Sequence, residues 1–80
     1  MENKIDLEIL RALKDHRKPR PFMHILNDVN IAMGKTFGKG YVFRRCMKLE
    51  NIAMIRTEKE GRMRMIKILD LGRALLRVYK

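Results

Sequence analysis

Four side chains that donate hydrogen bonds lie within about two turns of an expected helix, at Tyr41, Arg44, Arg45 and Lys48. They fall away from an apolar stripe at positions 42, 46 and 49, which has the spacing of one helix face. An arginine can bond guanine O6 and N7 with a fork of donors, and a lysine neutralises phosphate. The segment therefore predicts a helix that binds nucleic acid in a groove. The alternative is a basic helix face that meets only solvent.

A second basic segment follows the expected helix. Arg62 and Arg64 alternate with Met63 and Met65, and the preceding tetrad EKEG at 58–61 is expected to form a turn. This alternation predicts a hairpin in which the methionines face the core and the arginines face outward. It fails at the next residue, which predicts a bulge or a strand buried on both faces near its end. The candidate binding residues of the chain are Lys39, Tyr41, Arg44, Arg45, Lys48, Lys59, Arg62 and Arg64.

The net positive charge of the chain is concentrated in its second half, where both basic segments lie. Nineteen Lys and Arg against nine Asp and Glu give a formal net charge of +10 over 80 residues. Residues 1–35 hold seven cations and five anions, whereas residues 36–80 hold twelve cations and four anions. A positive field of this size raises the local concentration of an anionic partner. We therefore expect the binding surface in the second half.

Residues suited to catalysis or metal binding are few. The chain has no serine, and its one cysteine, Cys46, falls on the apolar stripe and is expected in the core. His24 and Asp28 lie one helical turn apart but make neither a metal site nor a catalytic triad. The segment GKTFGKG at 34–40 does not match the phosphate-binding loop motif. We expect neither an enzyme nor a bound cofactor, metal or small-molecule ligand.

Length and composition indicate one intracellular domain. Eighty residues suffice for a single small core, and a single cysteine forms no internal disulfide. No apolar run is long enough to span a bilayer, and the charged start MENKIDLEIL differs from a signal peptide. The expected location is the cytoplasm, on the nucleoid if the chain binds DNA, with no membrane partner.

Hydrophobic spacing predicts four helices and one hairpin within a single domain, residues 1–80. The helices are expected at about 3–16, 21–33, 40–51 and 70–79, and the hairpin at about 53–69. The segment at 35–40 contains two glycines that can take positive φ, and it predicts a short turn between the second and third helices. Two helices joined by such a turn form a helix-turn-helix arrangement.

Helix-capping signals mark the expected ends of these helices. Asn3 can cap the first helix, with Asp6 three residues on as its partner in a capping box. Gly34 is expected to close the second helix. Asp70 is expected to cap the last one.

Two stretches of the chain resemble one protein family. The run GYVFRRCMKLENIAMI at 40–55 resembles the third helix and following strand of winged helix-turn-helix regulators of the PadR and MarR type. The family pattern is met at Gly40, Val42, Phe43, Cys46, Leu49, Glu50, Met54 and Ile55. The tail RMRMIKILDLGRALL at 62–76 resembles the second wing strand and the opening of the last helix. Ala53 departs from the pattern where glycine is usual, and Leu69 where a capping threonine is usual.

The resemblance implies an α+β, mostly α fold. It would be a winged helix-turn-helix with a three-helix bundle, a two-stranded β wing and a short C-terminal helix. The third helix would enter the major groove, and the wing would touch the neighbouring backbone or the minor groove. On that analogy the donors at 41–48 would meet base edges, whereas Arg62 and Arg64 would belong to the wing.

The leading hypothesis from the sequence is a double-stranded DNA-binding protein, either a small transcription regulator or a chromosomal protein. A winged-helix module that binds structured RNA and one that binds an acidic protein are the alternatives. A homodimer is expected, because symmetric regulators gain affinity from two half-sites. Its expected interface is formed by the first and last helices, with Leu10, Leu71, Leu75, Leu76 and Val78.

Overall fold

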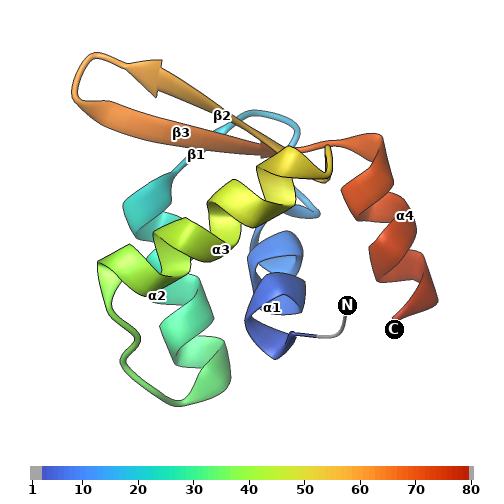
Figure 1. Ribbon diagram of the computed structural model, residues 1–80, viewed down its shortest axis with the longest axis horizontal. Helices are drawn as coiled ribbons and strands as arrows, with labels where there is room; N and C mark the ends of the chain where they lie inside the picture. The colour runs from blue at the N-terminus through green and yellow to red at the C-terminus, as the bar shows by residue number, and fades with distance from the viewer. Residues whose placement is uncertain (1–2, 80) are drawn as a thin grey trace.

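The computed structural model describes residues 3–79, which form four helices and a three-stranded antiparallel sheet (Figure 1). In chain order the elements are α1 (Lys4–Leu13), β1 (Arg20–Pro21), α2 (Phe22–Met33), α3 (Lys39–Asn51), β2 (Ile55–Glu60), β3 (Met63–Ile68) and α4 (Asp70–Val78). The first helix is three residues shorter at its C-terminus than expected, and α3 begins one residue earlier. No helix within residues 3–79 is long and apolar enough to cross a membrane.

The sheet has the strand order β1–β3–β2, so the hairpin of β2 and β3 is joined by a third strand. This hairpin, residues 55–68, is called the wing below. In β1, Arg20 pairs with Ile66 and Pro21 with Met65. Two residues are too few to show a period in the sequence, and proline is tolerated at a sheet edge because its missing N–H faces away from the ladder. The sequence pattern therefore does not predict β1.

The wing strands pair without interruption from Ile55 opposite Ile68 to Glu60 opposite Met63. Both expected alternatives are therefore wrong: no bulge interrupts the pairing, and Lys67 is exposed, so the end of β3 is not buried on both faces. The expected orientation of the methionines is also wrong. Because Ile66 and Ile68 are buried and side chains alternate along a strand, Met63 and Met65 belong to the other face. Met63 is 51 % exposed. Ile66 and Ile68 are buried with Ile55, whereas Met63 is not. Burial of the isoleucines therefore determines which face of β3 packs on the core.

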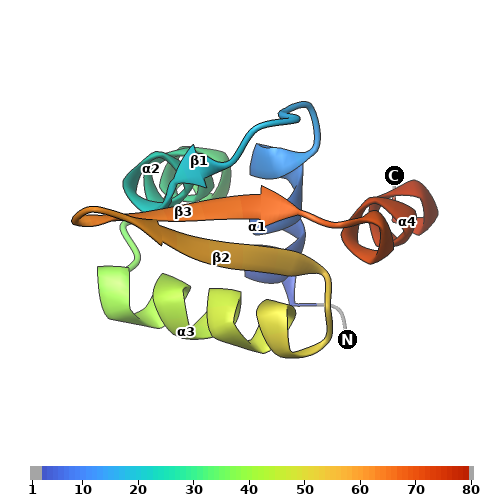
Figure 2. The same ribbon diagram turned by 90° about the horizontal axis from the view of Figure 1, so that it is seen from above.

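The core lies between the first three helices and the inner face of the wing. Figure 2 shows α3 along one side of β2 and β3, while β1 and the loop before it lie on the other side; α4 sits beyond the end of β3. The core residues are Ile5, Ile9, Leu10, Leu13, Phe22, Ile25, Leu26, Val29, Val42, Cys46, Leu49, Ile55, Ile66 and Ile68. Leu10 is fully buried among them, so the expectation that it faces a second subunit is wrong.

Two of the expected helix boundary signals are present as predicted. Asn3 accepts a hydrogen bond from the amide of Ile5 at 2.8 Å, so it caps α1. Gly34 follows α2 with φ +65°, the left-handed conformation that glycine adopts without cost.

Three other expected signals are corrected by the structure. Asp6 is not part of a capping box, because its carboxylate bonds Arg45. The two glycines between α2 and α3 do not take positive φ; Gly38 has φ −67° and Gly40 lies inside α3. Leu69, and not Asp70, occupies the cap position of α4, and its side chain makes no capping hydrogen bond.

Two residues at element junctions have unusual backbone surroundings. Ala53 joins α3 to β2 with φ +61°, in the left-handed region that a residue with a Cβ disfavours. It stands where the resembled family has glycine, a residue that adopts this conformation freely. Gly72 is buried in α4, and a Cβ there would lie 2.5 Å from the carbonyl oxygen of Met54. Only glycine lets α4 approach the junction between α3 and β2 this closely.

Candidate nucleic-acid interface

The inner side of α3 is fixed to the rest of the fold. Val42, Cys46 and Leu49 are buried, as the apolar stripe predicts. Burial raises the pKa of the Cys46 thiol to about 12, so at neutral pH it is a protonated core residue. At the C-terminal end of α3, the Glu50 carboxylate accepts hydrogen bonds from the Thr57 amide at 2.9 Å and from its hydroxyl at 2.9 Å. These bonds tie α3 to β2.

Of the eight predicted binding residues, Arg45 alone is held in an ion pair with Asp6 of α1 and does not lie on the exposed side of α3. Its guanidinium donates from Nε to Asp6 Oδ1 at 2.8 Å and from Nη2 to Asp6 Oδ2 at 2.6 Å. Asp6 is 1 % exposed. The hydrogen bond with Asp6 raises the pKa of Arg45 above its ordinary value. This two-pronged ion pair joins α3 to α1, and its guanidinium is not free to meet a base edge.

The spacing of both partners contains a signal that identifies this pair. Arg45 lies three residues after Val42 and four before Leu49, so it borders the apolar stripe of α3. Asp6 lies three residues before Ile9 and seven before Leu13, on the apolar face of α1. Opposite charges on two apolar faces are expected to pair, because a lone buried charge is costly.

The outer side of α3 carries Tyr41, Arg44 and Lys48, and all three are exposed. We call these residues the α3 face. Among residues 3–79, neither Arg44 nor Lys48 has an ion-pair partner. The Tyr41 ring lies 5.8 Å from the Phe37 ring, with 31° between their planes. Because the opposite side of α3 is anchored, this face presents donors on a fixed backbone.

The cations of the wing differ in how they are held. Arg64 lies on the face of β3 that turns toward α3, and its Cζ is 4.8 Å from the centre of the Phe43 ring. Phe43 in turn meets the edge of Phe22, with ring centres 5.6 Å apart. Arg64 therefore stacks on an aromatic pair between the wing and α3. Arg62, in the turn of the wing, and Lys59, opposite Arg64, are exposed and have no ion-pair partner among the described residues.

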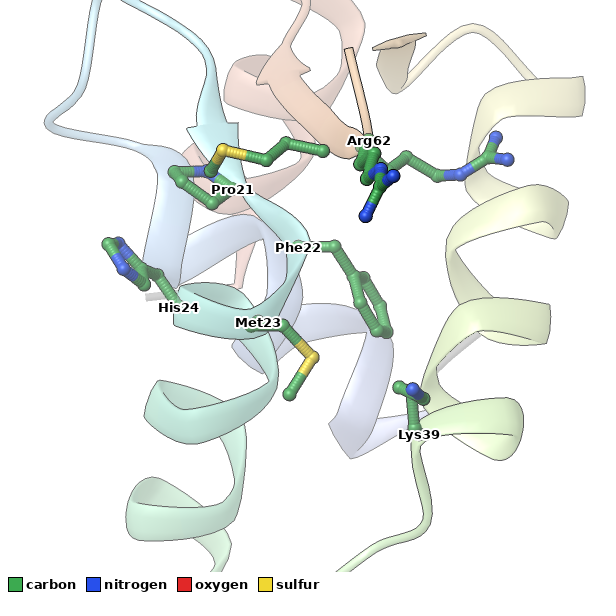
Figure 3. A pocket seen from close by; sticks show the side chains of 8 residues that line it. Pro21, Phe22, Met23, His24, Lys39 and Arg62 are labelled. Atoms are coloured by element: carbon green, nitrogen blue, oxygen red, sulfur yellow. The ribbon is translucent and has the colours of Figure 1, made fainter. Parts of the chain in front are cut away.

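A groove of about 320 Å³ separates the turn of the wing from the first turns of α2 and α3 (Figure 3). Phe22 and Met23 enter it from α2, Lys39 from the start of α3, and Arg62 from the wing. The complete lining is Pro21, Phe22, Met23, His24, Lys39, Arg62, Met63 and Arg64. The groove thus combines an apolar floor with three cations. Sequence reasoning found the cations but missed the apolar floor, because it depends on tertiary contacts that bring β1 and the start of α2 against β3.

Seven of the eight predicted binding residues are thus exposed on α3 and on the wing, which lie side by side (Figures 1 and 2). They are Lys39, Tyr41, Arg44, Lys48, Lys59, Arg62 and Arg64. His24 and Asp28 do not form a pair, since Asp28 bonds Arg20 at 2.8 Å. Across residues 3–79, no group of three or more His, Cys, Asp or Glu side chains is placed to hold a metal ion.

Comparison by sequence, with protein-family models and with curated proteins, finds no match. Solved structures, however, match over almost the whole chain. AF1382 of Archaeoglobus fulgidus has a TM-score of 0.79 at 23 % identity, covering 99 % of this chain and 84 % of that one. A PadR family transcription regulator of Clostridium difficile has a TM-score of 0.75 at 14 % identity, covering 96 % and 83 %.

Longer regulators contain the same fold as one part of their chain. The transcriptional regulator BldR of Sulfolobus solfataricus has a TM-score of 0.75 at 20 % identity, covering 95 % of this chain and 51 % of BldR. The chain thus spans about half the length of BldR. At such identities the likeness shows the fold alone. The chain has the winged-helix fold of PadR-family and other transcription regulators, which confirms the fold that the sequence resemblance implied.

Proposed function

We propose that the chain binds double-stranded DNA as a transcription regulator, with α3 in the major groove and the wing against the neighbouring backbone or minor groove. The observation that carries this proposal is the α3 face. Tyr41, Arg44 and Lys48 present donors that have no ion-pair partner among residues 3–79, while Arg45 and Glu50 hold the opposite side of the same helix. A B-form major groove, about 12 Å wide, admits one helix.

In this proposal the seven exposed residues contact bases, contact the backbone or hold the wing, and Tyr41 lies with Arg44 on the base-contacting α3 face. Arg44 lies at the centre of the α3 face, and its fork suits guanine O6 and N7. Lys39 and Lys48 flank it and neutralise phosphates on either side of the groove. Arg62 and Lys59 meet the backbone beside the wing. Arg64 contributes mainly by holding the wing against Phe43, 4.8 Å from its guanidinium carbon.

The protein acts as a homodimer in this proposal, and α4 provides the interface. Leu71 is 51 % exposed and Val78 is 76 % exposed, whereas Leu75 and Leu76 already pack partly on the core. Two copies joined through the exposed residues of α4 would present two α3 faces to successive half-sites, about 34 to 36 Å apart. Sedimentation of the wild type and of Leu71→Lys with Val78→Lys tests this. A wild type that remains monomeric when bound to DNA would contradict it.

Binding measurements with three nucleic acids test the proposed function. Duplex DNA, single-stranded DNA and hairpin RNA of equal length are titrated across a salt series. We expect the duplex to bind tightest. Arg62→Ala should weaken binding to all duplex sequences alike and lower the salt slope by about 0.9. Tighter binding of the hairpin RNA would favour the structured-RNA alternative. Absence of nucleic-acid binding would favour an acidic protein partner. A DNA-binding chain would act in the cytoplasm, on the nucleoid.

A further inference from the structure

A second group of cations lies far from the α3 face. Lys14 is the C-cap residue that follows α1, Arg17 and Lys18 lie in the loop, and Arg73 and Arg77 belong to α4. We call these five residues the rear face. Lys14, Asp15, Arg73, Leu76 and Arg77 line one open hollow of about 290 Å³. The Arg73 guanidinium also approaches the carbonyl oxygen of His16 at 3.5 Å. The loop and α4 are therefore neighbours, and their cations form one surface.

The rear face and the α3 face lie on different sides of the molecule. The loop at 14–19 leads into β1, the strand on one edge of the sheet. The α3 helix packs beside β2, the strand on the other edge. Figure 2 shows this separation directly, with α3 on one side of the wing strands, the loop on the other and α4 beyond the end of the sheet. A straight duplex docked on α3 as proposed would therefore run along the opposite side of the sheet from the loop.

The cations of the rear face are not neutralised within the fold. Among residues 3–79, none of Lys14, Arg17, Lys18 and Arg77 has an ion-pair partner. The segments that form the rear face, residues 14–18 and 70–78, hold five cations and only two anions, Asp15 and Asp70. Asp15 is the one anion that lines the hollow. Such an excess of exposed positive charge suits an extended anion and not another cationic surface.

We propose that the rear face binds the phosphate backbone of a second DNA segment, so that one chain bridges two duplexes. This inference rests on the proposed function, because the α3 face must hold the first duplex. Backbone binding requires cations alone, without base-edge donors on a helix. A long duplex held at the α3 face also brings other segments of the same polymer close, which raises the local phosphate concentration at the rear. The rear contact is therefore independent of base sequence and strongly dependent on salt.

A capture assay tests the bridge. One duplex is fixed to beads, the protein is added, and retention of a second, fluorescent duplex is measured. The rear variant carries Arg17→Gln, Lys18→Gln and Arg77→Gln. A matched front variant carries Arg44→Gln, Lys48→Gln and Arg62→Gln, and so removes the same charge. All six side chains are exposed, and circular dichroism checks that both variants are folded. Binding to a single short duplex is measured in parallel by anisotropy.

The rear variant should keep most of its affinity for the single short duplex and lose capture about tenfold or more, because each lost phosphate contact weakens the bridge. The front variant should lose both activities.

Capture by the rear variant at the wild-type level would overturn the bridge and assign capture to two α3 faces of a dimer. Wild-type protein that binds the short duplex without capturing the second would overturn the bridge alone. Wild-type protein that binds no duplex would remove the proposed function together with it. Stronger capture of labelled polyglutamate than of duplex would assign the rear face to an acidic protein.

Discussion

The two helices that flank the sheet region, α3 and α4, are held in opposite ways. Three apolar side chains of α3 are buried, Arg45 bonds Asp6 and Glu50 bonds Thr57. Only Gly72 of α4 is fully buried, while Leu71 and Val78 are largely exposed. The helix with the polar outer face is thus fixed by buried side chains and polar bonds, whereas α4 is held by the close approach at Gly72 and by the partly buried Leu75 and Leu76.

This contrast matches what each surface requires. In the proposed function the donors of α3 meet base edges and would lose affinity if their backbone moved, so the contacts that hold the inner side of α3 would keep them in position. In the proposed homodimer α4 packs against a second copy and would gain its order from that contact, so it would need few contacts of its own. Named residues make the contacts that hold each helix, so substitutions of these residues test the contrast.

Loss of the Asp6–Arg45 pair should have the largest effect. In Arg45→Ala the Asp6 carboxylate, 2 % exposed at its side chain, is left buried without its partner. Breaking a buried pair in this way costs about 3 to 5 kcal/mol of unfolding free energy. Urea unfolding measures it. Arg44→Ala, one residue away on the exposed side, should change stability by less than about 0.5 kcal/mol.

A double variant separates the pair's charge from its packing. Asp6→Leu with Arg45→Met replaces both charges by apolar side chains of similar size, and it should recover most of the lost stability. A single Arg45→Ala variant as stable as Arg44→Ala would show that the pair does not fix α3.

The docking of α4 should be sensitive to a single methyl group. In Gly72→Ala the new Cβ would lie 2.5 Å from the Met54 carbonyl oxygen, 3.0 Å from Ile68 and 3.1 Å from Leu10. We expect a loss near the upper end of the range for overpacking, about 1 to 3 kcal/mol, because the first of these atoms is backbone.

Gly40→Ala is the control for Gly72→Ala, since it makes the same change in α3. Nothing lies within 4 Å of a Cβ at Gly40. Alanine there should leave the stability unchanged or raise it by up to about 1 kcal/mol. Equal effects of the two substitutions in thermal unfolding would show that α4 does not depend on the close approach at Gly72.

The exposed side of α3 should matter for binding and not for stability. Arg44→Ala should weaken duplex binding about tenfold, within the range of about 1 to 3 kcal/mol for one base-edge fork. Lys67→Ala is the control. Lys67 is exposed on the outer face of β3, and its substitution removes the same charge. Fluorescence anisotropy measures both. Equal losses would mean that net charge, and not the α3 face, governs affinity.

Periodicity in the sequence was sufficient to predict the helices and the wing, because long amphipathic segments repeat their pattern several times. Periodicity did not predict the features that depend on contacts between distant parts of the chain. Arg44 and Arg45 are the same residue type side by side, and only the approach of Asp6 from α1 separates their roles. The strand β1 exists because β3 offers it an edge. Met63 and Met65 were assigned to the wrong face because local alternation does not weigh the isoleucines that follow.

The junction between α3 and β2 gives the last and smallest prediction. Ala53 has φ +61°, a conformation that costs a residue with a Cβ about 1 to 2 kcal/mol, whereas glycine adopts it freely. The greater entropy of glycine in the unfolded chain offsets part of this gain, so Ala53→Gly should stabilise the fold by up to about 1 kcal/mol. Ala74→Gly makes the same substitution on the exposed side of α4 and should destabilise by about 1 kcal/mol. Urea unfolding compares them. A loss of stability in both variants would mean that the left-handed residue at the end of α3 carries no strain.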